Sequence, residues 1–176
     1  MSFNYVSRLK IYRSERGSTM ISILDLFRIG VGPSSSHTVG PMRIARQFVS
    51  TLDQQSKLSL VSRIHVQLQG SLALTGVGHG SPIASVLGLL GAEPQTIDPD
   101  TVEKILAEPR AGTLRLLGKH SIKFDMMNDI ELACHITPRQ HPNGMRLRAY
   151  GTESLIADET YFSTGGGFIA TIAQIE

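Results

Sequence analysis

Hydroxyl side chains and an imidazole stand together in one short stretch, which a Gly-Pro pair flanks on each side. The stretch comprises Ser34, Ser35, Ser36, His37 and Thr38. Apolar residues then recur at spacings of three and four up to about residue 54, which predicts a long amphipathic helix. Pro41 is tolerated only in the first turn of that helix. We therefore predict that the helix begins at Thr38 or later and that an exposed loop precedes it.

A loop that leads into a helix N-terminus offers backbone N–H groups and the positive end of the helix dipole. Such a place suits a carboxylate or a phosphate. The alternative is a polar loop that merely supplies a helix cap, since Ser and Thr are ordinary caps. A cap needs one hydroxyl, whereas this stretch has four beside an imidazole. On the residues alone, both interpretations stay open.

Two histidines lie in segments bounded by glycine or proline. His79 stands between Gly78 and Gly80, and His141 begins a His-Pro-Asn-Gly sequence. We predict that both lie in turns, which would not bury the imidazole and would bring the backbone close to a ligand. Imidazole exchanges a proton near neutral pH, so both are candidate acid–base residues. The alternative is a turn histidine that is bonded to a nearby carbonyl.

Three glycines at residues 165–167 follow a strand pattern, and their backbone N–H groups could cradle an anion. The spacing is not that of a nucleotide-binding loop. The chain has one cysteine, Cys134, which cannot hold a four-iron cluster, and no pair of histidines has the helical spacing of a zinc site. We therefore expect no metal in this chain, and we expect Cys134 to pack in the interior or to be an inert thiol.

Hydrophobic periodicity predicts the elements that position these residues. Strict alternation over residues 63–69 predicts a half-buried strand with a more polar face, residues 83–90 predict a helix capped by Ser81, and residues 21–27 predict a short helix. Residues 145–149 and 156–162 predict two strands joined at 151–152, and residues 168–172 resume the strand pattern. The expected fold class is α+β, with a single mixed sheet and helices packed on it.

The bulk composition excludes several classes of function. The 176 residues, of which 41% are hydrophobic, fit one globular domain with its own core. A net charge of +2 is too small to indicate a nucleic-acid partner. No stretch is long and apolar enough for a membrane span, and the N-terminus lacks the pattern of a secretory signal. A cytoplasmic location is the default expectation.

Four segments together resemble bacterial iron–sulfur L-serine dehydratases. They are residues 32–42, residues 70–79 (Gly-Ser-Leu-Ala-Leu-Thr-Gly-Val-Gly-His), residues 141–145 (His-Pro-Asn-Gly-Met) and residues 161–169. The resemblance covers only the N-terminal beta domain of that family. It implies that residues 20–176 are this beta domain and that residues 1–19 are a poorly ordered leader or extension. The chain also resembles the intervening anion-binding domain of some phosphoglycerate dehydrogenases.

The resemblance implies an ammonia-lyase that converts L-serine to pyruvate and ammonia, in amino-acid catabolism and gluconeogenesis. Its [4Fe–4S] cluster would be bound by a catalytic alpha domain or subunit that is absent here, and one iron would act as a Lewis acid on the serine hydroxyl. This chain should then bind no cluster and be inactive alone. The resemblance gives acid–base roles to His79 and His141. It gives substrate contacts to Ser34, Ser35, Ser36, His37, Thr38, Asn143, Gly165 and Gly166.

The sequence departs from the family pattern around His79. Ser81 and Pro82 stand where Thr-Asp is expected, Val77 stands where lysine is common, and Gln69 stands where tyrosine is common. The expected surroundings of His79 therefore lack a carboxylate and a cation. Two other functions compete: a stand-alone regulatory domain that binds an anion or amino acid, and an inactive scaffold. The expected partners are the alpha domain, L-serine and, through an exposed apolar patch, a second copy of the chain.

Overall fold

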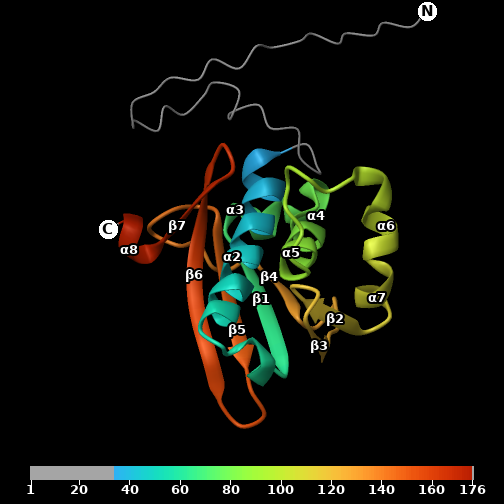
Figure 1. Cartoon of the computed structure of the whole chain (residues 1–176). Helices are drawn as coiled ribbons and strands as arrows, with labels where there is room; N and C mark the ends of the chain where they lie inside the picture. Colours follow the sequence, from blue (N-terminus) through green and yellow to red (C-terminus); the bar gives the residue numbers. More distant parts are fainter. Residues whose placement is uncertain (1–33, 176) are drawn as a thin grey trace, which may run out of the picture.

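The central element of the fold is one mixed sheet. The computed structural model describes residues 34–175. Within them the strands run in the order β4 (Ile130–Ala133), β1 (Arg63–Gln69), β5 (Gly144–Tyr150), β6 (Leu155–Gly165) and β7 (Phe168–Thr171), as Figure 1 shows. β4 pairs parallel to β1, and the other neighbours are antiparallel. The predicted mixed sheet is confirmed. The expected leader at 1–19 and the short helix at 21–27 lie outside the described residues.

Two helices bury the apolar face of this sheet. α2 (Gly40–Gln54) lies across the sheet, and α5 (Ser81–Leu89) packs beside it. The helices approach closely because Gly88 has no side chain: a Cβ there would lie 2.1 Å from the carbonyl oxygen of Met42. Ile64, Val66 and Leu68 of β1 are fully buried in the resulting core.

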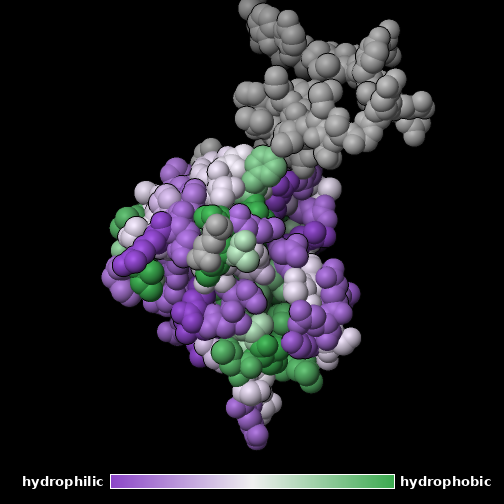
Figure 2. Space-filling model, turned by 90° about the vertical axis from the view of Figure 1, so that its left-hand side faces the viewer, coloured by the Kyte–Doolittle hydropathy of each residue, from purple (hydrophilic) through white to green (hydrophobic). Residues whose placement is uncertain are grey.

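The remaining described elements are short. They are η1 (Ser35–Val39), η2 (Leu58–Leu60), α3 (Ser71–Leu74), α4 (Gly76–His79), η3 (Pro99–Thr101), α6 (Val102–Ile105), α7 (Ala107–Arg110), the hairpin β2 (Thr113–Leu116) and β3 (His120–Lys123), and α8 (Ile172–Ile175). In Figure 1, α6 and α7 stand apart from the main sheet on the side of the β2–β3 hairpin. Figure 2, which views the molecule from the left-hand side of Figure 1, shows hydrophilic and hydrophobic residues interspersed on that face. No helix in residues 34–175 has the length and apolarity that crossing a membrane requires.

Three local predictions were wrong. The hydroxyl-rich stretch is not a loop, because residues 35–39 form a π-helical turn that runs directly into α2. The glycine-rich segment around His79 is not an open turn but the short helix α4. Ser81 does not cap α5; Gly80 holds that place with a φ of +72°, which a glycine adopts without strain, and so separates α4 from α5.

The second face of the sheet is more buried than the alternating pattern of β1 indicates. Gln67 and Gln69 are each only 6% exposed. The amide of Gln69 donates to Gln67, and the amide of Gln67 donates to the carboxylate of Glu131 on β4, both at 2.8 Å. The loop that follows β4 covers this end of the sheet: a Cβ on Gly144 would lie 2.7 Å from Pro138 and 2.9 Å from Gln69.

Candidate functional site

The π-helical turn of η1 orders the hydroxyl-rich stretch. Ser34 is its N-cap: its Oγ accepts the N–H of His37 at 3.3 Å, and its carbonyl accepts the N–H of Thr38 at 2.9 Å. Ser35 is exposed, whereas Thr38 is only 3% exposed. The turn therefore already uses two of the backbone N–H groups that an anion at the start of the helix would meet.

His37 is held by hydroxyl groups at both ring nitrogens. Its Nδ1 lies 2.8 Å from Oγ of Ser36, and its Nε2 lies 3.0 Å from Oγ of Ser71 at the start of α3. Burial, and next the neighbouring His79, lower the pKa of His37 below its ordinary value. At neutral pH this ring is therefore uncharged and links η1 to α3.

His79 is the last residue of α4 and faces His37. The two ring centroids lie 5.2 Å apart. The hydroxyl of Thr38 donates to the carbonyl oxygen of His79 at 2.8 Å, which fixes the end of α4 against η1. The Nδ1 atom of His79 is buried and has no hydrogen-bond partner among the described residues. An unpaired buried nitrogen costs about 1–3 kcal/mol, so a ligand that forms a hydrogen bond with this atom would stabilise the protein.

His141 lies in the turn that joins the post-β4 loop to β5. The backbone N–H of Asn143 donates to its Nδ1 at 3.1 Å, so the neutral ring must carry its proton on Nε2. The ring also makes an edge contact with Phe162, with centroids 6.4 Å apart. The side-chain amide of Asn143 is used elsewhere, since it donates to the carbonyl of Ser163 at 3.1 Å.

Ser71 connects the turn of His141 to the histidines of η1 and α4. Its backbone N–H donates to the carbonyl of Pro142 at 2.8 Å, and its side chain bonds to His37. The link from His79 to His141 therefore runs through His37, Ser71 and Pro142. The structure brings these motifs, which are far apart in the sequence, to one end of the sheet.

The glycine-rich hairpin between β6 and β7 joins the same region from another side. The hydroxyl of Ser163 donates to the carbonyl of Ser36 at 2.7 Å. Arg43 on α2 donates to the carbonyl of Gly167 at 2.5 Å. Gly165 and Gly166 have φ values of +96° and +57°, which glycine adopts readily. These contacts place the hairpin beside the start of α2, next to η1.

Sequence reasoning assigned no role to Ser71 and took Ser81 for a helix cap. Ser81 is fully buried, and its hydroxyl donates to the carbonyl of His37 at 2.5 Å. Both serines thus hold His37, one at its ring and one at its backbone. The sequence did contain a signal for a structural role of these serines, because both are small polar residues at the start of otherwise apolar helical segments.

The described residues do not provide the donor set of a metal centre. No group of three or more His, Cys, Asp or Glu side chains within residues 34–175 is arranged to hold an ion. Cys134 is exposed, so the first of the two alternatives for it, a cysteine packed in the interior, was wrong, and the inert thiol stays a prediction. A four-iron cluster typically takes several thiolates, and this chain has one cysteine, so its residues do not fit such a cluster.

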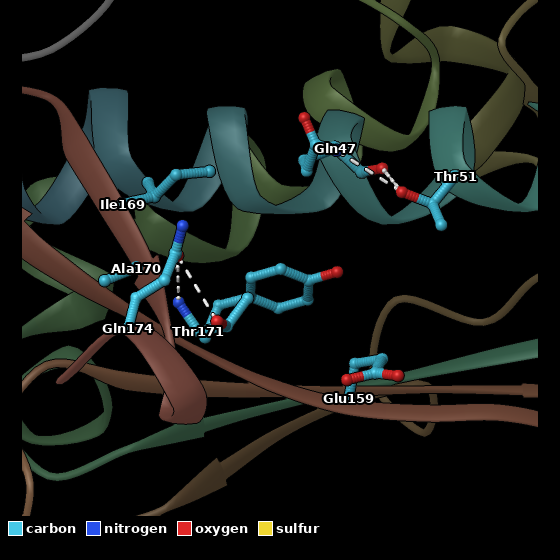
Figure 3. A pocket seen from close by; sticks show the side chains of 8 residues that line it. Gln47, Thr51, Glu159, Ile169, Ala170, Thr171 and Gln174 are labelled. Atoms are coloured by element: carbon cyan, nitrogen blue, oxygen red, sulfur yellow. Dashed lines mark hydrogen bonds between the residues drawn. The ribbon is translucent and has the colours of Figure 1, made fainter. Parts of the chain in front are cut away.

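A polar cavity of about 480 Å³ lies away from the histidines, between α2 and the β6–β7–α8 end of the chain. Figure 3 shows Gln47 and Thr51 of α2 on one side and Glu159 and Gln174 on the other. Burial, and then the charge of Glu159, raise the pKa of the Tyr161 hydroxyl in its wall to about 12. None of the candidate site residues lines this cavity, so it is separate from the candidate site.

Comparison with known proteins identifies the family. Residues 22–174 match the model of the family described as serine dehydratase beta chain. The L-serine dehydratase of Mycobacterium bovis is 49% identical over 153 residues, which are 86% of this chain and 33% of that protein. L-serine dehydratase 1 of Escherichia coli is 43% identical over 152 residues, which are 85% of this chain and 33% of that protein. The chain thus spans about a third of the length of the curated relatives it matches. On its fold and on these matches, the chain belongs to the serine dehydratase beta chain family.

Proposed function

We propose that this chain is the beta-domain part of a [4Fe–4S]-dependent L-serine ammonia-lyase, which converts L-serine to pyruvate and ammonia. The chain alone is inactive, because the cluster belongs to a companion catalytic domain. The observation that carries the proposal is the buried, unpaired Nδ1 of His79 in the cluster of side chains that joins η1, α3 and the turn of His141.

In this proposal His79 is the base. With the ring proton on Nε2, Nδ1 has a free lone pair for which no described protein group competes, and it accepts the proton from Cα of serine. His141 is the second acid–base residue: its Nδ1 accepts from Asn143, so its Nε2–H donates a hydrogen bond to the departing hydroxyl. The proton that His79 removed from Cα passes to this hydroxyl, which leaves as water, so both rings end in their neutral form. The product, 2-aminoacrylate, tautomerises and takes up water to give pyruvate and ammonium, which balances the reaction.

The remaining candidate residues bind and orient the substrate. The exposed Ser35 and the hairpin glycines Gly165 and Gly166 offer hydroxyl and backbone N–H groups to the substrate carboxylate. Thr38 supports them from inside, because it is buried and its hydroxyl donates to the carbonyl of His79. Asn143 positions His141 through its backbone rather than its side chain, since its amide is bonded to Ser163. His37 is a positioning residue, because Ser36 and Ser71 occupy both ring nitrogens.

The test is a chimera in which this chain replaces the matching third of Escherichia coli L-serine dehydratase 1, purified and assayed without oxygen. We expect pyruvate formation that depends on serine, and none from the chain alone. His79→Ala or His141→Ala should lower kcat by about 100-fold or more, the usual contribution of general acid–base catalysis. The control is His120→Ala, because His120 bonds to the carbonyl of Val61 in another part of the chain. A folded chimera without activity would disprove the proposal.

A second candidate is a stand-alone regulatory domain that binds an anion or an amino acid. The observation that favours it is the exposed Ser35 beside Ser36 at a turn that leads into the 15-residue helix α2. Titration calorimetry of the isolated chain with serine and with phosphate separates the two functions. Heat of binding that is lost in a Ser35→Ala, Ser36→Ala double variant, together with an inactive chimera, would favour the regulatory domain.

A further inference from the structure

An apolar groove of about 620 Å³ runs along β4, at the edge of the sheet. Its apolar lining consists of Val77, Pro82, Met126, Met127, Ile130 and Leu132. The exposed fractions are 86% for Met127, 71% for Val77 and 37% for Leu132. Large apolar side chains gathered in one exposed groove are typical of a binding surface rather than of ordinary scattered exposure.

The residues that line the groove come from both faces of the sheet at the edge strand β4. Leu132 of β4 lies opposite Leu68 of β1, on the face that the helices cover, whereas Glu131 lies opposite Gln67 on the other face. Among the described strands, β4 pairs with β1 alone, so its outer backbone edge is unpaired by any strand. An unpaired edge of this kind presents backbone N–H and C=O groups to which another segment can bind.

The charged groups beside the groove are already paired. Glu131 accepts a hydrogen bond from Gln67 and lies 3.6 Å from Nε2 of His65. Asp129, which precedes β4, is bonded to Arg63 at 2.7 Å. The groove therefore attracts a partner through apolar contact rather than through unpaired charge.

The groove lies next to the candidate site, although none of the candidate site residues lines it. Val77, in its wall, and His79, with its unpaired Nδ1, belong to the same four-residue helix α4. Pro82 follows in α5, one residue after Ser81, which holds the backbone of His37. A body that covers the groove therefore comes within one helical turn of His79.

We infer that this groove is the surface on which the companion catalytic domain docks, an inference that rests on the proposed function. The size of the unmatched part of the relatives supports this occupant, because the relatives are about three times as long as the matched region. Its position supports the same occupant, because the domain that completes the reaction must reach α4.

The test uses this chain co-expressed with the part of Escherichia coli L-serine dehydratase 1 that it does not match, as two separate polypeptides. We expect the two to purify together. Val77→Glu and Met127→Glu should each weaken the complex at least about tenfold, because each buries a charge without a partner. The matched controls are Leu60→Glu and Leu155→Glu, whose side chains are 62% and 51% exposed and do not line the groove. Unchanged circular dichroism would show that all four variants fold.

The possible outcomes distinguish a wrong docking surface from a wrong proposed function. If the chimera is active but the separate polypeptides do not associate, or associate equally well with Met127→Glu, the docking surface is wrong and the function stands. If the isolated chain forms a dimer that Val77→Glu and Met127→Glu dissociate, the groove binds a second copy and the inference is overturned. An inactive chimera removes the function on which the inference rests.

Discussion

At the scale of single residues, the three histidines of the site differ in which ring nitrogens are already bonded. His37 contacts a hydroxyl at each nitrogen, and His141 accepts a backbone N–H at Nδ1. The Nδ1 of His79 is buried without a partner in residues 34–175. The sequence showed three imidazoles near glycines, but only the side-chain contacts separate a positioning residue from a candidate base.

The lowered pKa of His37 predicts how stability depends on pH. The folded protein holds the ring neutral, whereas in the unfolded chain it titrates at its ordinary value near 6.5. The unfolded state therefore binds more protons in acid, so the stability that this group contributes is present above pH 6.5 and is lost as the pH falls through the folded-state pKa. The pKa of His65 is lowered as well, first by burial and then by Arg148, so it acts in the same direction.

Urea unfolding at pH 7.5 and pH 5.5 measures this effect. We expect a lower free energy of unfolding at the acid pH. The difference should shrink in His37→Gln, which keeps a polar side chain but does not titrate. Equal pH dependence in the variant and the parent chain would show that His37 is not held neutral by the fold.

At the scale of elements, the packing of α2 on α5 depends on the absence of a side chain at Gly88. A Cβ at this position would meet the carbonyl oxygen of Met42 at 2.1 Å and the Cβ of Ala45 at 2.8 Å, so the two helices would have to move apart. We expect Gly88→Ala to lower the free energy of unfolding by about 1–3 kcal/mol, as overpacked cores do.

The matched control is Gly78→Ala. Gly78 also lies in a helix, α4, but a Cβ there meets nothing within 4 Å. Because alanine favours helix more than glycine does, this variant should be as stable as the parent or slightly more stable. Thermal unfolding of the two variants in parallel provides the comparison. A loss of stability that is equal in both would rule out close packing as the cause.

The long periodic elements were predictable from the sequence, and the short elements around the site were not. The strand at residues 63–69 was predicted with its observed bounds, and the start of α2 after Thr38 was confirmed. The helix α4 has only four residues, among them Gly76 and Gly78, so local propensity favours a turn there. Contacts with η1 stabilise it instead, and such contacts between distant segments leave no periodic signal.

At the scale of the whole molecule, we assign binding of the companion domain and proton transfer to two neighbouring but distinct regions of one domain. In the proposed division, the groove along β4 would hold the companion domain and the histidines at the end of the sheet would transfer protons. If this division is correct, a covalent link to the companion should compensate for a damaged groove, because a tether raises the effective concentration to about the millimolar range. No tether can replace a lost proton acceptor.

This argument predicts opposite behaviour for two variants of the chimera. Met127→Glu should keep a kcat within about twofold of the parent chimera, because the side chain is 86% exposed and lies in the groove. His79→Ala should remain at least about 100-fold slower in the same chimera. As separate polypeptides, His79→Ala should bind the companion as tightly as the parent chain does, whereas Met127→Glu should bind it at least about tenfold more weakly. If Met127→Glu abolished activity even in the chimera, or if His79→Ala prevented assembly, the groove and the histidines would form one inseparable surface.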